Sequence, residues 1–219
     1  ATVNGYHDHN FLTIHERLTD HLGDRAPHGQ VRQRLHRVRA TRVVLATGAH
    51  ERPLVYANND LPGNMVAGAV STYIRRYAVA PGQRLVLSTN NDYAYRVALD
   101  WLEAGRQVVA VADARPNPRG AWVEEVRKRG VRVMGGTAVS EARGNTRVTG
   151  AKIATIDLTA FRTLGGGEWL DCDLIATSGG YSPVVHLASH LGGRPLWRDD
   201  IQAFVPGPAP QKRLCAGGV

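Results

Sequence analysis

Two short segments combine small residues with glycine directly after an apolar run, which is a composition typical of ligand-binding turns. Thr47-Gly48 follows residues 43–46, and Thr177-Ser178-Gly179 follows residues 173–176. In open α/β sheets, ligands bind at the carboxyl ends of parallel strands, where glycine lets a ligand approach the backbone closely. A tight turn without a ligand has the same composition, so one copy of the motif fits either interpretation. Its recurrence favours a dinucleotide-binding fold.

A third turn, residues 88–93, stands where a Rossmann fold has its phosphate-binding turn. Asp113 lies where an acid that binds the ribose is expected. However, the turn reads Ser-Thr-Asn-Asn-Asp-Tyr and has no glycine, so β-carbons block the approach of a pyrophosphate to the backbone. Asp92 also places a negative charge where a phosphate would sit. We therefore expect a Rossmann-like skeleton without a working pyrophosphate site, in which Asp92 caps the following helix.

Histidines and a carboxylate form two clusters that could bind a metal ion. His7, Asp8 and His9 lie together near the start, and His186 and His190 would share one face of a helix. A zinc site needs three or four ligands at recognisable spacing, and neither cluster supplies them. The sequence also has no GxSxG motif, no P-loop and no candidate catalytic triad. We assign no metal site and no catalytic residue.

Five arginines recur between residues 32 and 42, and the chain carries a net charge of +8. Such a series could bind nucleic acid. No aromatic residue interleaves with it, so a platform for stacking bases lacks its stacking partners. The solvent face of a hairpin gives the same pattern, because arginines also discourage edge pairing. The charge favours acidic partners, whether nucleic acid, nucleotide phosphates or an acidic subunit, and does not choose among them.

Length and composition set the class of protein. The chain has 219 residues, of which 43% are hydrophobic and 21% charged, which suits one large or two small domains with a sizeable core. No apolar run approaches the ~18–20 residues that span a bilayer. Cys172 and Cys215 form no CxxC pair, so neither a disulfide scaffold nor a dithiol redox centre is expected. We expect a cytoplasmic location and no membrane association.

Hydrophobic periodicity predicts the elements that position these turns. Helices are expected over residues 12–22, 67–77, 92–104 and 122–129. Strands are expected over residues 33–38, 42–46, 84–88, 107–112, 131–134, 147–159, 168–170 and 173–177. The first two strands turn at residues 40–41, and the second is apolar on both faces. The alternation of strand and helix predicts an α/β fold, a Rossmann-like parallel sheet with crossover helices plus an antiparallel β-meander.

Several segments closely resemble the alpha subunits of heterotetrameric sarcosine oxidases. The resemblance is carried by residues 6–10, 43–63, 88–99, 113–116, 178–187 and 203–207. The motif Ala-Thr-Gly-Ala-His-Glu-Arg-Pro, residues 46–53, is also shared with related flavoprotein subunits such as opine oxidase, hydrogen cyanide synthase and proline dehydrogenase. The glycine-free turn is the feature that points to the sarcosine oxidase alpha subunit.

This resemblance implies a nested architecture of two dinucleotide-binding domains. Residues 1–60 would be part of an outer FAD/NAD-binding-type domain, residues 64–182 an inserted degenerate Rossmann-like domain, and residues 190–219 the return to the outer domain. The chain would then be a fragment, with the glycine-rich loop of the outer domain before Ala1. We expect the isolated chain to bind NAD weakly or not at all.

The resemblance also implies a function. The chain would belong to a flavin-dependent amine oxidase that oxidatively demethylates sarcosine and produces hydrogen peroxide. NAD would contact Thr47 and Gly48, with Gly217 and Gly218 behind them. FAD and FMN would belong to the assembled complex, mostly on or shared with a beta-type flavoprotein subunit, and smaller subunits would complete the hetero-oligomer. In such a complex the positive charge would meet nucleotide phosphates and partner subunits rather than nucleic acid. Two alternatives stay open: part of a related FAD-dependent amino-acid or opine oxidase or dehydrogenase, and a non-catalytic interaction module built on the degenerate Rossmann turn.

Overall fold

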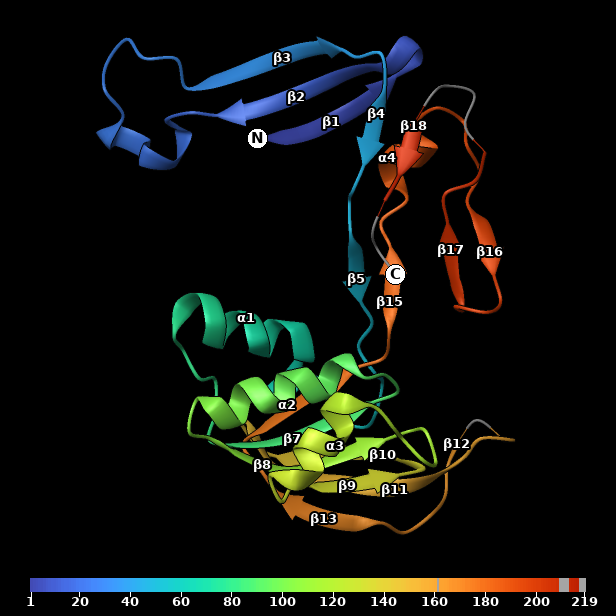
Figure 1. Ribbon diagram of the computed structural model, residues 1–219. Coiled ribbons are helices and arrows are strands. Elements are labelled where there is room, and N and C mark those ends of the chain that lie inside the picture. The colour runs from blue at the N-terminus through green and yellow to red at the C-terminus, as the bar shows by residue number, and fades with distance from the viewer. Residues whose placement is uncertain (161, 209–212, 217–219) are drawn as a thin grey trace. The chain divides into compact units, whose positions relative to one another are not determined.

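The computed structural model describes residues 1–160, 162–208 and 213–216. The chain divides into two compact units, one formed by residues 1–50 together with 181–219, the other by residues 51–180 (Figure 1). The second unit therefore interrupts the first in the sequence. Assigning the two units to an outer and an inserted dinucleotide-binding domain stays a prediction.

A five-stranded parallel sheet forms the centre of residues 51–180. Its strand order is β6-β14-β7-β8-β9. The strands are β6 (Asn64–Val66), β14 (Leu174–Ser178), β7 (Arg84–Thr89), β8 (Gln107–Asp113) and β9 (Arg132–Gly135). Helix α2 (Tyr93–Glu103) connects β7 to β8, and α3 (Ala121–Lys128) connects β8 to β9. The predicted alternation of strand and helix is confirmed.

The parallel sheet is the middle of three layers. Helices α1 (Ala67–Tyr77), α2 and α3 cover one face (Figure 1). Leu85 and Leu87 of β7 belong to the apolar cluster under these helices, whereas Val86 between them belongs to the cluster on the opposite face. Successive side chains of a strand point to opposite faces, so an all-apolar strand is buried on both sides.

Antiparallel strands cover the second face of the parallel sheet. They are β10 (Thr137–Gly144), β11 (Val148–Asp157), β12 (Arg162–Thr163) and β13 (Glu168–Asp171). Strand β11 pairs with β13 in the antiparallel sense, as predicted from the sequence. The periodicity does not predict strand β10, although it forms the longest ladder with β11. The α/β fold class with an antiparallel addition is confirmed.

The other unit contains a three-stranded antiparallel sheet, ordered β1-β2-β3. Its strands are β1 (Thr2–His7), β2 (Phe11–Arg17) and β3 (Gln33–Arg39). The helix expected over residues 12–22 is wrong, because β2 and a short 3-10 helix, η2 (Asp20–Arg25), occupy that segment. The apolar residues of this segment fit a helical spacing, but Leu12 and Ile14 also fit the spacing of two that is typical of a strand. Backbone hydrogen bonds to the two neighbouring strands stabilise the strand.

Short elements complete this unit. They are η1 (Asp8–Asn10), β4 (Val43–Leu45), β5 (Ala49–Glu51), β15 (Tyr181–Pro183), α4 (His186–Ser189), β16 (Leu196–Arg198), β17 (Ala203–Val205) and β18 (Arg213–Cys215). Strand β4 pairs in parallel with β18, so it does not form the expected hairpin with β3. Val43 and Leu45 are buried, but Val44 is 60% exposed, and the expected burial of this strand on both faces is wrong.

None of the helices in the described part of the chain combines the length and the apolar character that crossing a membrane requires.

Candidate functional site

The turn after β4 carries the first predicted contact residues. Thr47 and Gly48 lie two and three positions after Leu45, the last residue of the strand. Gly48 has a φ of +73°, a left-handed backbone conformation that costs other residues ~1–2 kcal/mol. No described atom lies within 4 Å of the position that a β-carbon would take there. The glycine therefore leaves its backbone open to a ligand rather than to the protein's own side chains.

Two hydrogen bonds hold this turn in place. The Thr47 hydroxyl donates to the backbone oxygen of Val184 at 2.7 Å, and the amide of Val184 donates to the backbone oxygen of Gly48 at 2.9 Å. Val184 directly follows β15, so the two segments that meet here are far apart in the sequence. Because Thr47 uses its proton for Val184, its hydroxyl oxygen can take part in a further hydrogen bond only as an acceptor.

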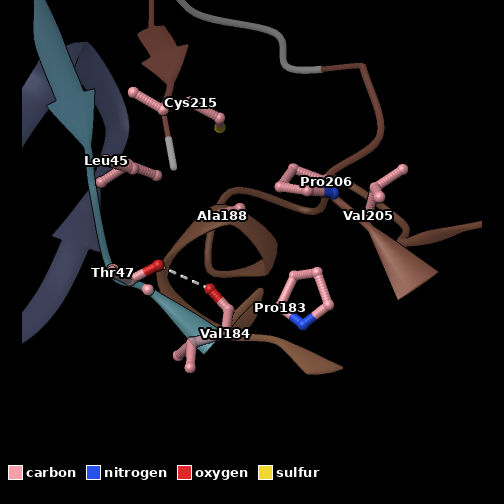
Figure 2. Close-up of a pocket in the computed structure, with 10 residues that line it drawn as sticks. Leu45, Thr47, Pro183, Val184, Ala188, Val205, Pro206 and Cys215 are labelled. Atoms are coloured by element: carbon pink, nitrogen blue, oxygen red, sulfur yellow. Dashed lines mark hydrogen bonds between the residues drawn. The ribbon is translucent and has the colours of Figure 1, made fainter. Parts of the chain in front are cut away.

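A cavity of about 190 Å³ opens beside this turn (Figure 2). Its lining is mostly apolar and comes from five segments: Leu45, Thr47, Gly48, Pro183, Val184, Ala188, Val205, Pro206, Cys215 and Ala216. Pockets that enclose a drug-sized ligand have volumes of ~300–1,000 Å³. The described residues therefore suit one part of a dinucleotide, such as a ring or a sugar, rather than the whole of it. Gly217 and Gly218, the other two predicted contacts, lie outside the described residues.

The second copy of the motif, at the end of β14, is occupied by the protein itself. A β-carbon on Gly179 would lie 2.9 Å from the backbone oxygen of Arg52 and 2.8 Å from a methyl group of Leu54. Thr177 accepts a hydrogen bond from the amide of Leu54 at 3.4 Å. The glycine here serves close packing of two backbone segments, so the two similar motifs have different physical roles.

Asparagine side chains close the turn between β7 and α2. The Asn91 amide group donates to the backbone oxygen of Ser178 at 3.0 Å, and its oxygen accepts the amide hydrogen of Tyr93 at 3.1 Å. None of the residues from 88 to 93 has a positive φ. The expected N-cap at Asp92 is wrong, because its side chain makes no capping hydrogen bond. Asn91 satisfies the first helical amide instead, which leaves Asp92 available for an ion pair.

The predicted ribose-binding acid, Asp113, is fully buried and bound by neighbouring side chains. The Tyr95 hydroxyl donates to its carboxylate at 2.7 Å. The Arg115 guanidinium donates to both carboxylate oxygens, at 3.0 and 2.7 Å, and to Asp92 at 2.8 Å. Such a bidentate pair satisfies the acceptors that a ribose would otherwise use. Burial is the main reason that the pKa of Tyr95 lies well above its usual range, and the hydrogen bond to Asp113 raises it further.

No local pattern in the sequence signals this network, because Arg115 is one of many arginines and the contact forms only when β8 ends beside the first turn. The same holds for Val205 and Pro206 in the cavity, which reach the turn after β4 through tertiary folding alone.

One histidine of each predicted cluster forms a hydrogen bond within the protein. His190 accepts a hydrogen bond from the Tyr6 amide at 3.3 Å, and His7 bonds to Thr13 at 3.2 Å. Throughout the described residues, no group of three or more metal-ligating side chains could hold an ion.

No protein-family model matches the chain. Curated proteins do match it, over all or most of its length. It is 41% identical over 219 residues to the sarcosine oxidase alpha chain of Corynebacterium sp. (strain P-1), and 38% identical over 208 residues to the protein of the same name from Rhizobium meliloti (strain 1021). The chain spans 22% and 20% of these two proteins, about a fifth of their length. An opine oxidase component of Rhizobium meliloti is more distant, at 27% identity over 77% of this chain and 34% of that protein.

Solved structures share the fold at low sequence identity. The L-proline dehydrogenase of P. horikoshii matches 99% of this chain and 35% of its own, with a TM-score of 0.60 and 19% identity. The thioredoxin reductase of T. acidophilum matches 84% of this chain and 60% of its own, with a TM-score of 0.59 and 19% identity. The resemblance to sarcosine oxidase alpha subunits that the sequence motifs indicated is confirmed, and the chain shares its fold with these two oxidoreductases.

Proposed function

Because the chain matches one segment of sarcosine oxidase alpha subunits from its first residue to its last, we propose that it is part of an oxidoreductase subunit of that kind. The whole enzyme would oxidatively demethylate sarcosine and release hydrogen peroxide. The observation that carries this proposal is the 41% identity over all 219 residues. A match of this length includes both units, so it does not come from a shared nucleotide-binding motif alone.

We infer that the unit formed by residues 1–50 and 181–219 contacts the dinucleotide, which we propose to be NAD. The open backbone at Gly48, the ordered hydroxyl of Thr47 and the apolar cavity beside them support this location. Gly217 and Gly218 stay candidate contacts. The residues 51–180 unit has the Rossmann skeleton, but Arg115 and Asn91 fill the places where a ribose and a pyrophosphate would bind. We therefore propose one dinucleotide for this part of the subunit.

The chemistry itself belongs to the assembled complex. Flavin bound there, FAD and FMN in our proposal, supplies the oxidation of the amine and the passage of electrons to oxygen. It would lie mostly on a beta-type flavoprotein subunit or be shared with it, and smaller subunits would complete a cytoplasmic hetero-oligomer. We assign no catalytic residue to this chain. Its own residues would bind the dinucleotide, shape an apolar wall beside it and hold the turn that contacts it.

A related substrate is the second candidate. The similarity to an opine oxidase component, at 27% identity, favours an amino-acid or opine oxidase or dehydrogenase of the same group. A non-catalytic interaction module is the third candidate, and the self-filled turn between β7 and α2 favours it. These candidates differ in flavin content and in substrate, so one preparation distinguishes them.

The test uses the full-length polypeptide, co-expressed with its partner subunits and purified as the complex. We expect yellow flavin absorbance and sarcosine-dependent formation of hydrogen peroxide, measured with a peroxidase-coupled dye. If the complex oxidises an opine or proline but not sarcosine, the second candidate is the function. A colourless complex that oxidises none of these amines would leave the interaction module as the function.

A further inference from the structure

One face of the three-stranded sheet β1-β2-β3 gathers basic side chains around an aromatic ring. Phe11 lies opposite His7 of β1 on one side and Arg39 of β3 on the other. Thr13, two positions further along β2, lies opposite Arg37. Residues directly opposite in antiparallel strands share a face, and so do alternate residues of one strand. We call the following set the basic face: His7, Phe11, His15, Arg37 and Arg39.

The Phe11 ring contacts two side chains of the basic face. The guanidinium carbon of Arg37 lies 5.5 Å from the centre of the Phe11 ring, and the ring of His7 lies 5.6 Å from it at 41°. A guanidinium over an aromatic face is held by a cation–π interaction. A side chain that is ordered before binding loses less conformational entropy when a partner arrives. The arrangement therefore prepares Arg37 for an anionic partner.

The charge of this face is not neutralised by the sheet. Its three strands contain one carboxylate, Glu16, which lies on the opposite face beside Arg34 and His36. Among the described residues, no carboxylate forms an ion pair with Arg37 or Arg39, whereas Arg34 on the same strand is paired at 3.5 Å. The hydrogen bond with His36 lowers the pKa of Glu16.

The two faces of the sheet also differ in what covers them. Tyr6 and Leu12 on the opposite face belong to the buried apolar cluster of this unit. Arg37 and Arg39 are exposed, and Leu35 on the basic face is 61% exposed. An apolar side chain beside two unpaired arginines suits a peptide that presents both acids and an apolar residue.

We propose that the basic face is the docking surface for an acidic segment of a partner polypeptide. The proposal rests on the proposed function only in that a hetero-oligomer would supply such a partner. Charge complementarity is its main argument, since unpaired arginines steer an acidic partner and fix its register. Single-stranded nucleic acid fits less well, because base stacking needs open aromatic faces and the Phe11 ring lies under Arg37.

The test measures binding of two labelled probes to the full-length polypeptide by fluorescence anisotropy. The probes are a decaglutamate peptide and single-stranded decathymidylate at the same salt concentration. Arg37→Gln/Arg39→Gln is compared with Arg127→Gln/Arg129→Gln, which makes the same charge change on and just beyond α3. Arg37→Lys/Arg39→Lys keeps the charge of the basic face. Thermal unfolding of each variant checks that it is folded.

We expect decaglutamate to bind the original protein, to bind the lysine variant nearly as well, and to bind Arg37→Gln/Arg39→Gln about tenfold more weakly. The control variant should lose less than about twofold in affinity. Equal losses in the two glutamine variants would overturn the proposal, and so would tighter binding of decathymidylate that depends on Arg37 and Arg39. NAD titration of the same samples keeps this result separate from the proposed function, because it reports on the cavity at Thr47 and Gly48.

Discussion

The hydroxyl of Thr47 donates a hydrogen bond of 2.7 Å to the backbone oxygen of Val184, which lies 137 positions later in the chain. The amide of Val184 returns a bond of 2.9 Å to Gly48. This reciprocal pair joins the turn after β4 to the segment after β15 and forms one wall of the apolar cavity (Figure 2). The proposed dinucleotide contact therefore depends on two segments that the intervening unit separates in the sequence.

Thr47→Val tests the first of these bonds. Valine has nearly the shape of threonine but no donor, so the oxygen of Val184 loses its partner. We expect the free energy of unfolding to fall by about 1 kcal/mol and the affinity of the full-length protein for NAD to fall about fivefold. Denaturant unfolding and calorimetric titration measure the two quantities. Thr72→Val is the matched control, because Thr72 also bonds a backbone oxygen, that of Gly68, but lies on α1 far from the cavity in sequence. An equal loss of NAD affinity in the control would contradict the proposed contact.

Gly48→Ala separates backbone strain from ligand approach. The φ of +73° makes alanine costly by ~1 kcal/mol, although no described atom would clash with it. Gly192 in the same unit has a φ of +77° and equally open surroundings, so Gly192→Ala carries the same strain without lying at the cavity. We expect similar losses of stability in the two variants and a loss of NAD affinity in Gly48→Ala alone. If the two titrations are indistinguishable, Gly48 is not a contact.

Tyr95→Phe tests the network that fills the second turn. The hydroxyl of Tyr95 bonds the buried carboxylate of Asp113, and bonds to charged groups contribute ~1.5–3 kcal/mol. We expect a loss of about 2 kcal/mol in the free energy of unfolding and no change in NAD binding. Tyr73→Phe, which removes an exposed hydroxyl from α1, should change stability by less than about 0.5 kcal/mol. A Tyr95→Phe protein that binds NAD differently would show that the residues 51–180 unit takes part in dinucleotide binding.

The sequence predicts β7, β8, β9 and β14 of the parallel sheet because their signals are local, but it predicts no strand at β6. An apolar run that is buried on both faces, followed by an amphipathic helix and a glycine, has few alternative structures. Helix α2 follows the buried strand β7 and ends before Gly105, and its observed bounds agree to within one residue with the predicted 92–104. The segment at residues 12–22 lacks such a signal. Its leucines fit a helical period, but Leu12 and Ile14 also fit a strand, and pairing with β1 and β3 decides the outcome. Strand β10 escapes prediction for the same reason, since its small and polar residues become a strand only beside β11.

The candidate site is predictable only as far as its motif is local. Thr47 and Gly48 stand out because glycine follows an apolar strand. Their partner Val184 does not stand out, since the contact needs β15 to return beside the turn. Asn91 and Asp92 show a finer limit, because both residue types cap helices and only the folded turn determines which side chain reaches the first helical amide.

The environment of the Asp100 carboxylate predicts that the stability of the unit formed by residues 51–180 depends on pH. Its carboxylate is buried on α2 and accepts hydrogen bonds of 2.7 Å from both Ser71 and Arg75 of α1. Burial by itself would raise the pKa of Asp100, but the bonds from Arg75 and Ser71 outweigh it and hold the pKa below its ordinary value of 3.8. A carboxyl whose pKa is lower in the folded protein stabilises the fold above its unfolded pKa, and this contribution disappears as the pH falls through the folded pKa.

Asp100→Asn should therefore be destabilised by about 2 kcal/mol at pH 7, because the Arg75 guanidinium loses a charged partner but stays half exposed to water. The difference should shrink steadily below pH ~4, as Asp100 of the original protein takes up its proton. Urea unfolding between pH 2 and 7 measures it. Glu103→Gln is the control, since Glu103 lies on the same helix near Arg75 but is exposed, and its effect should stay within about 0.5 kcal/mol at every pH. A gap between Asp100→Asn and the original protein that does not change with pH would mean that the charge of Asp100 is not what joins α1 to α2.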